Sequence, residues 1–328
     1  CNIAIQLKPD YVSAYRTRAL SHKEKGNYDL AISDFTRLIE LQPALSSIFQ
    51  SSRAYTYLAK KDYATAVAEF TKLIEARPNS SSGYAGRGQA YIEKEEFELA
   101  IADLSKAIEI DPKAWEALFD RGYAYYKKEK YREAVKDFSK MIELNPDQAA
   151  KAYLIRGTAY IMIGDRSLAI DDISKYLERK PTDVGAYTLR GKQYVAVKNY
   201  KFAVVDFSEV IRLAPNSASA YLERAKSYLL SDDPDLAISD LNRVIRDNPK
   251  ECDAYFYRGR AHINKSSYEL AIADLGAAIQ LCPTRAANSF LNRGVIYLDR
   301  GNLDLAILDF SKAIELEPKA AVGYHNRA

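Results

Sequence analysis

The strongest constraint on the fold is a proline that returns at nearly constant spacing along the 328 residues. Successive members of the series lie 34 or 35 residues apart. The series is Pro9, Pro43, Pro78, Pro112, Pro146, Pro181, Pro215, Pro249, Pro283 and Pro318. A fixed period of this length is typical of repeat architectures, in which each unit stacks on its neighbours. The chain is therefore predicted to be an array of similar units.

Each interval contains two helical patterns separated by a short break. In one interval the first pattern places Tyr187, Arg190 and Tyr194 at spacings of three and four, and "KNY" then interrupts it. The second pattern is the run "FAVVDFSEVIRL", and the proline that follows ends it. A hairpin of two such helices cannot bury its own apolar face, so each unit is expected to stack on the next.

The repeated unit is similar to the tetratricopeptide repeat. The first helix carries an aromatic residue such as Tyr15, Tyr84 or Tyr153 and a second one such as Tyr91 or Tyr160. The second helix opens with an alanine in every complete unit: Ala31, Ala66, Ala100, Ala134, Ala169, Ala203, Ala237, Ala271 and Ala306. The resemblance covers the whole chain. It implies an all-α fold, a right-handed superhelical solenoid of stacked antiparallel helix hairpins, whose first helices line a concave groove that binds peptides or protein segments.

The ends of the chain fall inside helices of the repeat. With the closing proline as position 32 of 34, Cys1 is at position 24 of a second helix and Ala328 is at position 8 of a first helix. We expect a single array over residues 1–328, with nine complete repeats at about 10–317 and a partial helix at each end. Because both ends are cut inside helices, we expect the sequence to be an excerpt of a longer array or an incompletely recorded chain.

Position 7 is arginine in every repeat, and an acid follows sixteen residues later at position 23. The two positions are equidistant from the turn near position 15, so each arginine is expected to reach its own acid or that of an adjacent repeat. The fork of arginine suits a carboxylate. The sequence therefore predicts a structural ion-pair ladder that includes Arg87, Asp103, Arg121, Asp137, Arg156, Asp172, Arg190, Asp206, Arg224, Asp240, Arg258 and Asp274. The alternative is a row of exposed arginines that binds an acidic ligand.

The same geometry sets small residues opposite each other. Position 8, as in Gly157, and position 20, as in Ala169, lie almost level on the two helices of a hairpin. We therefore expect the helices of each repeat to approach closely at this point.

The family's geometry directs positions 2, 5, 6, 9, 12 and 13 toward the groove, and these vary between repeats. They are polar and mixed in the first three repeats but largely apolar in repeats four to eight. The predicted partner-binding groove comprises Phe119, Tyr123, Tyr126, Leu154, Ile155, Ile161, Met162, Leu189, Lys192, Leu222, Lys226, Phe256, Tyr257 and Arg260. At position 9, Lys192, Lys226 and Arg260 form a short basic row beside the apolar strip. The strip and the row together suit an amphipathic helix or an extended peptide with a few acidic residues. The alternative is that positions 5 and 12 are partly buried, which would leave a narrower strip.

Composition and motifs exclude several function classes. Lysine plus arginine (47) nearly balance aspartate plus glutamate (44) without a basic cluster, which argues against a nucleic-acid partner. No apolar run reaches the length of a membrane span, so we expect no membrane insertion. Three cysteines are too few for a disulfide framework, and Cys252 and Cys282 are expected to be unrelated thiols. Unpaired thiols favour a reducing compartment, so we expect a cytoplasmic location.

No residue set has the pattern of an active site. There is no glycine-rich phosphate loop, no nucleophile elbow and no set of His, Cys or acidic residues with metal-ligand spacing. We therefore expect no catalytic residue, cofactor or metal, and a noncatalytic protein–protein interaction scaffold or adaptor. Two alternatives stay open: a substrate-recognition arm of a larger multidomain enzyme, as in glycosyltransferases with similar repeats, and a self-assembling oligomerisation module.

Overall fold

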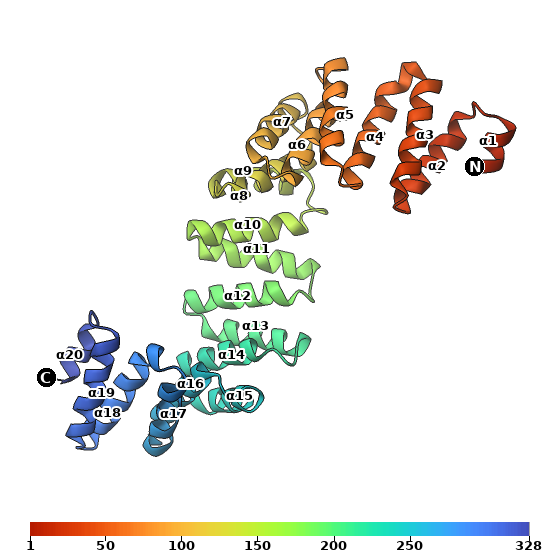
Figure 1. The fold of residues 1–328 in the computed structure, drawn as a ribbon. Helices are drawn as coiled ribbons and strands as arrows, with labels where there is room; N and C mark the ends of the chain where they lie inside the picture. The colour runs from red at the N-terminus through yellow and green to blue at the C-terminus, as the bar shows by residue number, and fades with distance from the viewer. Residues whose placement is uncertain (328) are drawn as a thin grey trace. The chain divides into compact units, whose positions relative to one another are not determined.

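The chain folds into α-helices joined by short turns, as the computed structural model shows (Figure 1). The structure describes residues 1–327; Ala328, which the sequence places within a first helix, lies outside them. The chain divides into two compact units, Cys1–Tyr176 and Leu177–Ala328. We describe each unit by itself.

The first unit contains helix hairpins in which first and second helices alternate. Its elements are α1 (Asn2–Leu7), α2 (Val12–Glu24), α3 (Tyr28–Leu41), the 3₁₀ helix η1 (Pro43–Leu45), α4 (Ser46–Ala59), α5 (Tyr63–Ala76), α6 (Ser81–Glu93), α7 (Phe97–Ile110), α8 (Trp115–Lys127), α9 (Tyr131–Leu144), α10 (Ala150–Ile163) and α11 (Arg166–Arg179), whose last residues belong to the second unit. The even-numbered helices from α2 to α10 are first helices of their repeats.

The second unit continues the same alternation. Its elements are α12 (Val184–Ala196), α13 (Tyr200–Leu213), α14 (Ala218–Leu230), α15 (Pro234–Asp247), α16 (Cys252–Asn264), α17 (Tyr268–Leu281), the 3₁₀ helix η2 (Pro283–Arg285), α18 (Ala287–Asp299), α19 (Leu303–Leu316) and α20 (Ala321–Arg327). Helices pack mainly against their immediate neighbours in the chain within each unit. The all-α repeat fold expected from the sequence is confirmed.

The core of each hairpin is built on the residue at position 24, four residues after the invariant alanine. It is almost completely buried in every complete repeat, as Phe35, Phe70, Leu104, Phe138, Ile173, Phe207, Leu241, Leu275 and Phe310. Beside it the helices approach closely, as predicted. A Cβ added to Gly157 would lie 3.1 Å from Cγ1 of Ile173 and 3.4 Å from the carbonyl oxygen of Ala169. Larger residues at these positions would separate the two helices.

The turn between the helices requires one left-handed residue, always at position 15. Glycine supplies it at Gly26, Gly164 and Gly301, with φ between 76° and 98°. Lys61, Glu95, Glu129, Lys198, Asp232 and Ser266 adopt φ between 54° and 65° at the same place. Since a left-handed conformation costs a residue with a Cβ roughly 1–2 kcal/mol, the packing of the hairpin holds these turns.

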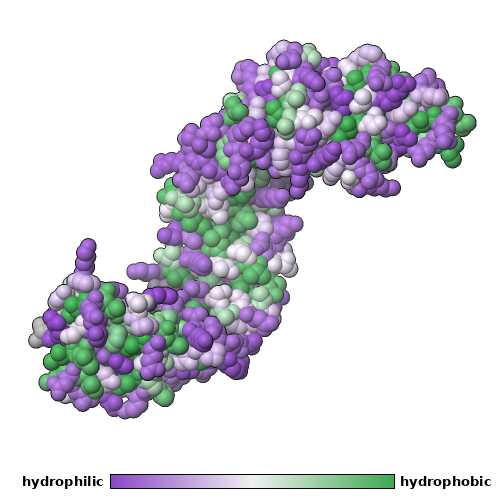
Figure 2. Space-filling model, in the orientation of Figure 1, coloured by the Kyte–Doolittle hydropathy of each residue, from purple (hydrophilic) through white to green (hydrophobic). Residues whose placement is uncertain are grey.

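The surface carries isolated and clustered apolar residues on second helices. Figure 2 shows hydrophobic side chains exposed over α12. On α13, Phe202 and Val205 are 55% and 56% exposed. Phe202 stacks on Tyr194 with ring centroids 5.3 Å apart. None of the helices within residues 1–327 is long and apolar enough to cross a membrane.

Candidate functional site

The arginine of each complete repeat lies on the acid of the same repeat. Eight of the nine acids are aspartates, and each accepts two hydrogen bonds: Nε to Oδ2 at 2.7–3.0 Å and Nη2 to Oδ1 at 2.6–2.8 Å. In the remaining repeat, Arg53 donates twice to Oε2 of Glu69. Every predicted partner of the ladder is thus brought together, and the acids are buried.

Aromatic rings lie beside most of these arginines, and Arg156, Arg190, Arg224 and Arg293 each lie near two rings. The guanidinium of Arg156 lies 5.7 Å from the ring centroid of Tyr153 and 5.8 Å from that of Tyr160, and its side chain is 14% exposed. Burial alone would lower the pKa of Arg156, but the hydrogen bond and charge of Asp172 raise it above its ordinary value. These arginines are therefore engaged inside the stack and do not form an exposed row for an acidic ligand.

A third residue joins seven of these arginine–acid pairs, and sequence reasoning missed it. Nη1 of the arginine donates across to position 25 of the preceding repeat at 2.7–3.1 Å, as between Arg156 and Ser139 or Arg224 and Ser208. The Ser139 hydroxyl in turn donates to its own helix at the carbonyl of Val135, 2.7 Å away. Each such arginine therefore joins two repeats. The signal was present, because Ser, Thr or Asn recurs two residues after the acid.

Repeat eight interrupts this pattern with a glycine. Gly276 stands at position 25, and Arg293 in the next repeat donates only to Asp309 within the described part of the chain. A Cβ on Gly276 would lie 3.5 Å from Nη1 of Arg293. The junction between α17 and α18 thus lacks the hydrogen bond that its equivalents have.

The predicted groove residues of the first unit are mostly half-buried. Phe119, Tyr123, Tyr126 and Ile155 pack against the core cluster around Phe138, and the ring centroids of Phe119 and Phe138 are 5.6 Å apart. Leu154 and Ile161 are also partly buried, whereas Met162 is 58% exposed. The exposed apolar surface in this unit is therefore smaller than the full set of predicted groove residues would provide.

The second unit shows the same partial burial. Leu222 and Tyr257 pack against the cluster around Leu241, Phe256 packs against the next cluster, and Leu189 is partly buried. In the predicted basic row, Lys192 and Arg260 are exposed.

Lys226 already has partners. Its ammonium donates to Glu223 at 2.9 Å and lies 4.9 Å from the ring centroid of Tyr257. Its positive charge is therefore partly neutralised within the protein, and the basic row offers less free positive charge to a ligand than the sequence indicates.

A hollow of about 680 Å³ in the first unit lies where groove positions of three repeats meet. We call it the α6–α8 hollow. It is lined by Tyr55 from α4, by Ser82, Ala85 and Gln89 from α6, and by Trp115, Glu116, Phe119 and Asp120 from α8. These residues occupy positions 1, 2, 5, 6 and 9 of their repeats. Phe119 is the one residue of the predicted groove that lines it, so most of this site was missed.

Asp120 has the most perturbed acidity of the hollow. Burial, with the negative charges of Glu116 and Glu93, raises the pKa of its carboxyl group from 3.8 to about 7. Burial also raises the pKa of Tyr55, whose hydroxyl donates weakly to the carbonyl of Ser82 at 3.4 Å. Acids at positions 2 and 6 of one helix share a face, and this spacing was the available signal in the sequence.

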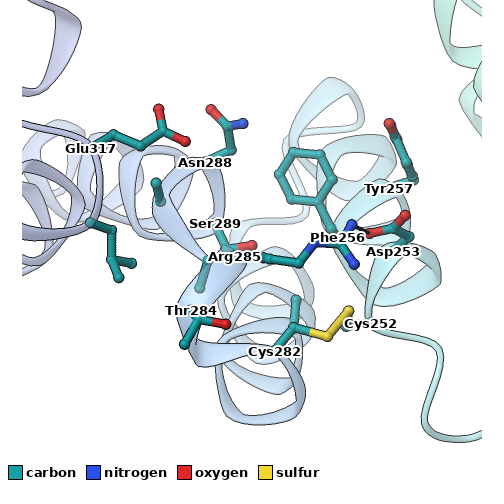
Figure 3. A pocket seen from close by; sticks show the side chains of 14 residues that line it. Cys252, Asp253, Phe256, Tyr257, Cys282, Thr284, Arg285, Asn288, Ser289 and Glu317 are labelled. Carbon is teal, nitrogen blue, oxygen red and sulfur yellow. Dashed lines mark ion pairs between the residues drawn. A yellow bond between two sulfur atoms is a disulfide. The ribbon is translucent and has the colours of Figure 1, made fainter. Parts of the chain in front are cut away.

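The second unit has a hollow of about 420 Å³ at the corresponding place (Figure 3). Its wall includes Phe256 and Tyr257 of the predicted groove, both on α16, and Asn288 on α18. Arg285 of η2 reaches over it and pairs with Asp253 at 3.6 Å, as the dashed line in Figure 3 marks. This hollow is therefore partly closed by its own ion pair.

Cys252 and Cys282 form a disulfide at the edge of this second hollow. The expectation of two unrelated thiols is wrong. Cys252 begins α16 and Cys282 directly follows α17, so the bond ties the start of the first helix to the end of the second helix of one repeat. The argument for a reducing compartment from unpaired cysteines is thereby removed. Cys1, which is exposed, is the free cysteine within residues 1–327.

Neither hollow has the donor set of a metal site. Across residues 1–327, no three His, Cys, Asp or Glu side chains are grouped so that they could hold a metal ion.

Three family models described as tetratricopeptide repeat match the sequence. One matches residues 88–157, a second matches 287–320, and the third matches both 16–81 and 222–288. Together these segments cover most of the chain. No curated protein matches the sequence.

Solved structures with similar folds include three repeat proteins. The C-terminal part of a TPR repeat-containing protein from Cytophaga hutchinsonii is 18% identical, with a TM-score of 0.60 over 74% of this chain and 98% of that one. PilF from Pseudomonas aeruginosa is 16% identical, with a TM-score of 0.50 over 65% of this chain and 97% of that one. A MamA protein is 27% identical, with a TM-score of 0.47 over 52% of this chain and 93% of that one.

Proposed function

Because the chain belongs to the tetratricopeptide repeat family, we propose that it is a noncatalytic scaffold that binds a polypeptide segment of a partner protein on its first helices. Proteins of this family bind protein partners. One observation carries the proposal: side chains at positions 2, 5, 6 and 9 of successive repeats line the α6–α8 hollow. A concave site with aromatic walls and a few polar groups is the usual form of a ligand site.

Half-buried apolar residues at other groove positions are further candidate contacts, and each unit is considered by itself. Leu154 in the first unit and Leu189 in the second lie at groove positions of their repeats and remain partly exposed. A segment of the partner that lies along the first helices would cover such side chains and gain hydrophobic free energy of about 25 cal/mol for each Å² buried.

The test uses random linear peptides displayed on phage and selected on the full chain. We expect the selected peptides to lose at least tenfold in affinity for the variant Ala85→Trp, because the indole would fill the α6–α8 hollow. Ala102→Trp is the matched control, since Ala102 is exposed on the second helix α7 and should leave binding unchanged. Equal binding to both variants would refute the hollow as the peptide site.

A second set of variants tests the neighbouring apolar residues. Leu154→Asp and Leu189→Asp, made singly and together, place a charge where a bound segment would exclude water, and each is expected to weaken binding. If the double variant captures the selected peptides as well as the native chain does, the surface does not extend to these residues. Light scattering over a range of concentrations separates peptide binding from self-association of the chain.

A further inference from the structure

Asp120 is a half-buried acid without a partner in a protein whose buried acids are all paired within residues 1–327. Every position-23 acid accepts hydrogen bonds from its own arginine, whereas the carboxyl group of Asp120 makes no hydrogen bond or ion pair with any described residue. The residue is half-buried at the α6–α8 hollow, and this burial raises the pKa of its carboxyl group. A half-buried carboxylate without a partner in the chain is costly, so a cation supplied from outside the chain would stabilise its charge.

The nearest arginine in the sequence cannot serve Asp120. Arg121 directs Nε and Nη2 to Asp137 at 2.8 Å and Nη1 to Ser105 at 3.0 Å. Its guanidinium is therefore held within the ladder, and neighbouring residues on a helix do not face each other. The charge of Asp120 is left for a cation that enters the hollow from outside.

Negative charge dominates the lining of this hollow. Glu116 stands one turn before Asp120 on α8, and Asp111 stands at the rim, where its carboxylate accepts a hydrogen bond from the backbone of Lys113 at 3.0 Å. Lys113 is the one basic residue among the lining side chains. Three carboxylates against one ammonium leave an excess of negative charge, and Glu93 adds to the potential at Asp120. Such a lining repels acidic ligands and attracts basic ones.

Aromatic rings supply the remaining chemistry. Trp115, Phe119 and Tyr55 contribute to the wall of the hollow beside the two acids of α8. Faces of aromatic rings attract ammonium and guanidinium groups, with tryptophan the strongest, and they also pack against the apolar stem of a long basic side chain. The same combination occurs within this protein, where the ammonium of Lys226 lies over Tyr257 and contacts Glu223.

We propose that the α6–α8 hollow receives a lysine or arginine side chain of the bound partner segment, with Asp120 and Glu116 as its counter-ions and the rings of Trp115 and Phe119 against its stem. The inference rests on the proposed function and specifies the ligand of that site. It differs from the sequence-based expectation of an acidic partner, which was drawn from the basic row of repeats six to eight. A guanidinium also offers the planar donors that a carboxylate accepts best.

A consequence is that binding responds to pH near neutrality. The empty hollow holds Asp120 with a pKa of about 7, and the groups around it are Glu116 on α8, Glu93 on α6, Tyr55 on α4, and Asp111 and Lys113 in the turn before α8. A cation favours the ionised carboxyl group, so affinity should rise about tenfold from pH 6 to pH 8 as the ionised fraction increases.

The experiment uses two tripeptides, acetyl-Leu-Arg-Leu-amide and its citrulline twin, which has nearly the same shape but no charge. Trp115 is the one tryptophan of the sequence, so its fluorescence reports binding at the hollow directly. We expect the arginine peptide to bind the full chain at least ten times more tightly than the citrulline peptide. Asp120→Asn should weaken the arginine peptide at least tenfold and abolish the difference between the two.

The control has the same charge change at a distant site. Glu133→Gln removes one negative charge from the exposed face of α9, and it should leave the preference for arginine intact. If arginine and citrulline peptides bind equally well, the basic ligand is wrong while peptide binding survives. If neither tripeptide nor any displayed peptide changes Trp115 fluorescence, the hollow is not a peptide site and both proposals are wrong.

Discussion

Gly276 leaves a gap in the row of hydrogen bonds that joins successive repeats, and replacing it with serine is predicted to stabilise the chain. The junction between repeats four and five is equivalent, because its two position-7 arginines are also 35 residues apart. There Arg156 donates from Nη1 to the hydroxyl group of Ser139 at 2.8 Å. A Cβ on Gly276 would lie 3.5 Å from Nη1 of Arg293, which is an ordinary contact distance. The side chain of serine therefore fits, and its hydroxyl can accept the missing hydrogen bond.

Two contributions set the magnitude. Serine is favoured over glycine inside a helix by about 0.5 kcal/mol. A hydrogen bond from a guanidinium adds about 1–1.5 kcal/mol, which is low for a charged donor, because the side chain of Arg293 is 21% exposed and already in contact with water. Gly276→Ser should thus raise the free energy of unfolding by about 1.5–2 kcal/mol. Gly276→Ala gains only the helical preference, about 1 kcal/mol.

The comparison of the two variants separates the hydrogen bond from helix propensity. Urea unfolding of the full chain gives the global effect, and hydrogen exchange of the α17 and α18 amides locates it. Ala273→Ser is the matched control, because Ala273 is exposed on the same helix and serine there should cost about 0.5 kcal/mol. The reasoning is refuted if Gly276→Ala equals or exceeds Gly276→Ser in stability.

Three further predictions concern other parts of the chain. Asp172→Ala should cost about 3–5 kcal/mol, because it strands a half-buried guanidinium, whereas Asp171→Ala, which breaks an exposed pair with a lysine, should cost less than about 1 kcal/mol; equal melting temperatures would show that the ladder is not structural. Replacing Cys252 and Cys282 by serine should cost about 3–4 kcal/mol, and dithiothreitol should destabilise the native chain but not this variant. Asp120→Asn should stabilise the chain at pH 8 by up to about 4 kcal/mol, because the pKa of Asp120 is raised from 3.8 to about 7 and each pKa unit is worth about 1.4 kcal/mol. The raised pKa of this carboxyl group favours folding at low pH and loses that advantage between about pH 4 and 7, so the gain of the variant should vanish at pH 4, which urea titrations at both pH values would test.

The sequence predicted the parts of the molecule that every repeat needs. Proline after the second helix, alanine at position 20 and the pair at positions 7 and 23 recur in all nine complete repeats, so each copy supports the interpretation of the others. The disulfide was missed although the same hairpin rule covers it. Cys252 and Cys282 occupy positions 1 and 31, which are nearly equidistant from the turn, as positions 7 and 23 are. Because these cysteines occur in one repeat only, no periodic signal drew attention to them.

The α6–α8 hollow was missed for a different reason. Its residues vary from repeat to repeat, and the burial of Asp120 depends on neighbours from three helices, which no local pattern reveals. The apolar residues that the sequence selected, such as Tyr123 and Tyr126, pack partly into the core because large side chains at groove positions also fill the space between successive first helices. An apolar residue at a variable position thus indicates either core packing or ligand binding. An acid without a partner beside aromatic rings is a more specific indication of ligand binding.

This contrast has a physical basis in how the repeats divide their positions. The residues at positions 7, 8, 20, 23, 24 and 25 hold each hairpin together and join it to the next, as Arg121, Asp137 and Ser105 do around α8. Because these positions stabilise the stacking, an unfavourable residue at position 6 is tolerated, and ionisation of the half-buried Asp120 costs stability. A functional acid of this kind should therefore be more stable as asparagine yet no longer bind a basic ligand, which is the opposition between stability and function expected of binding sites. A framework acid such as Asp137 should instead lose stability when neutralised, because its arginine is left without a counter-ion.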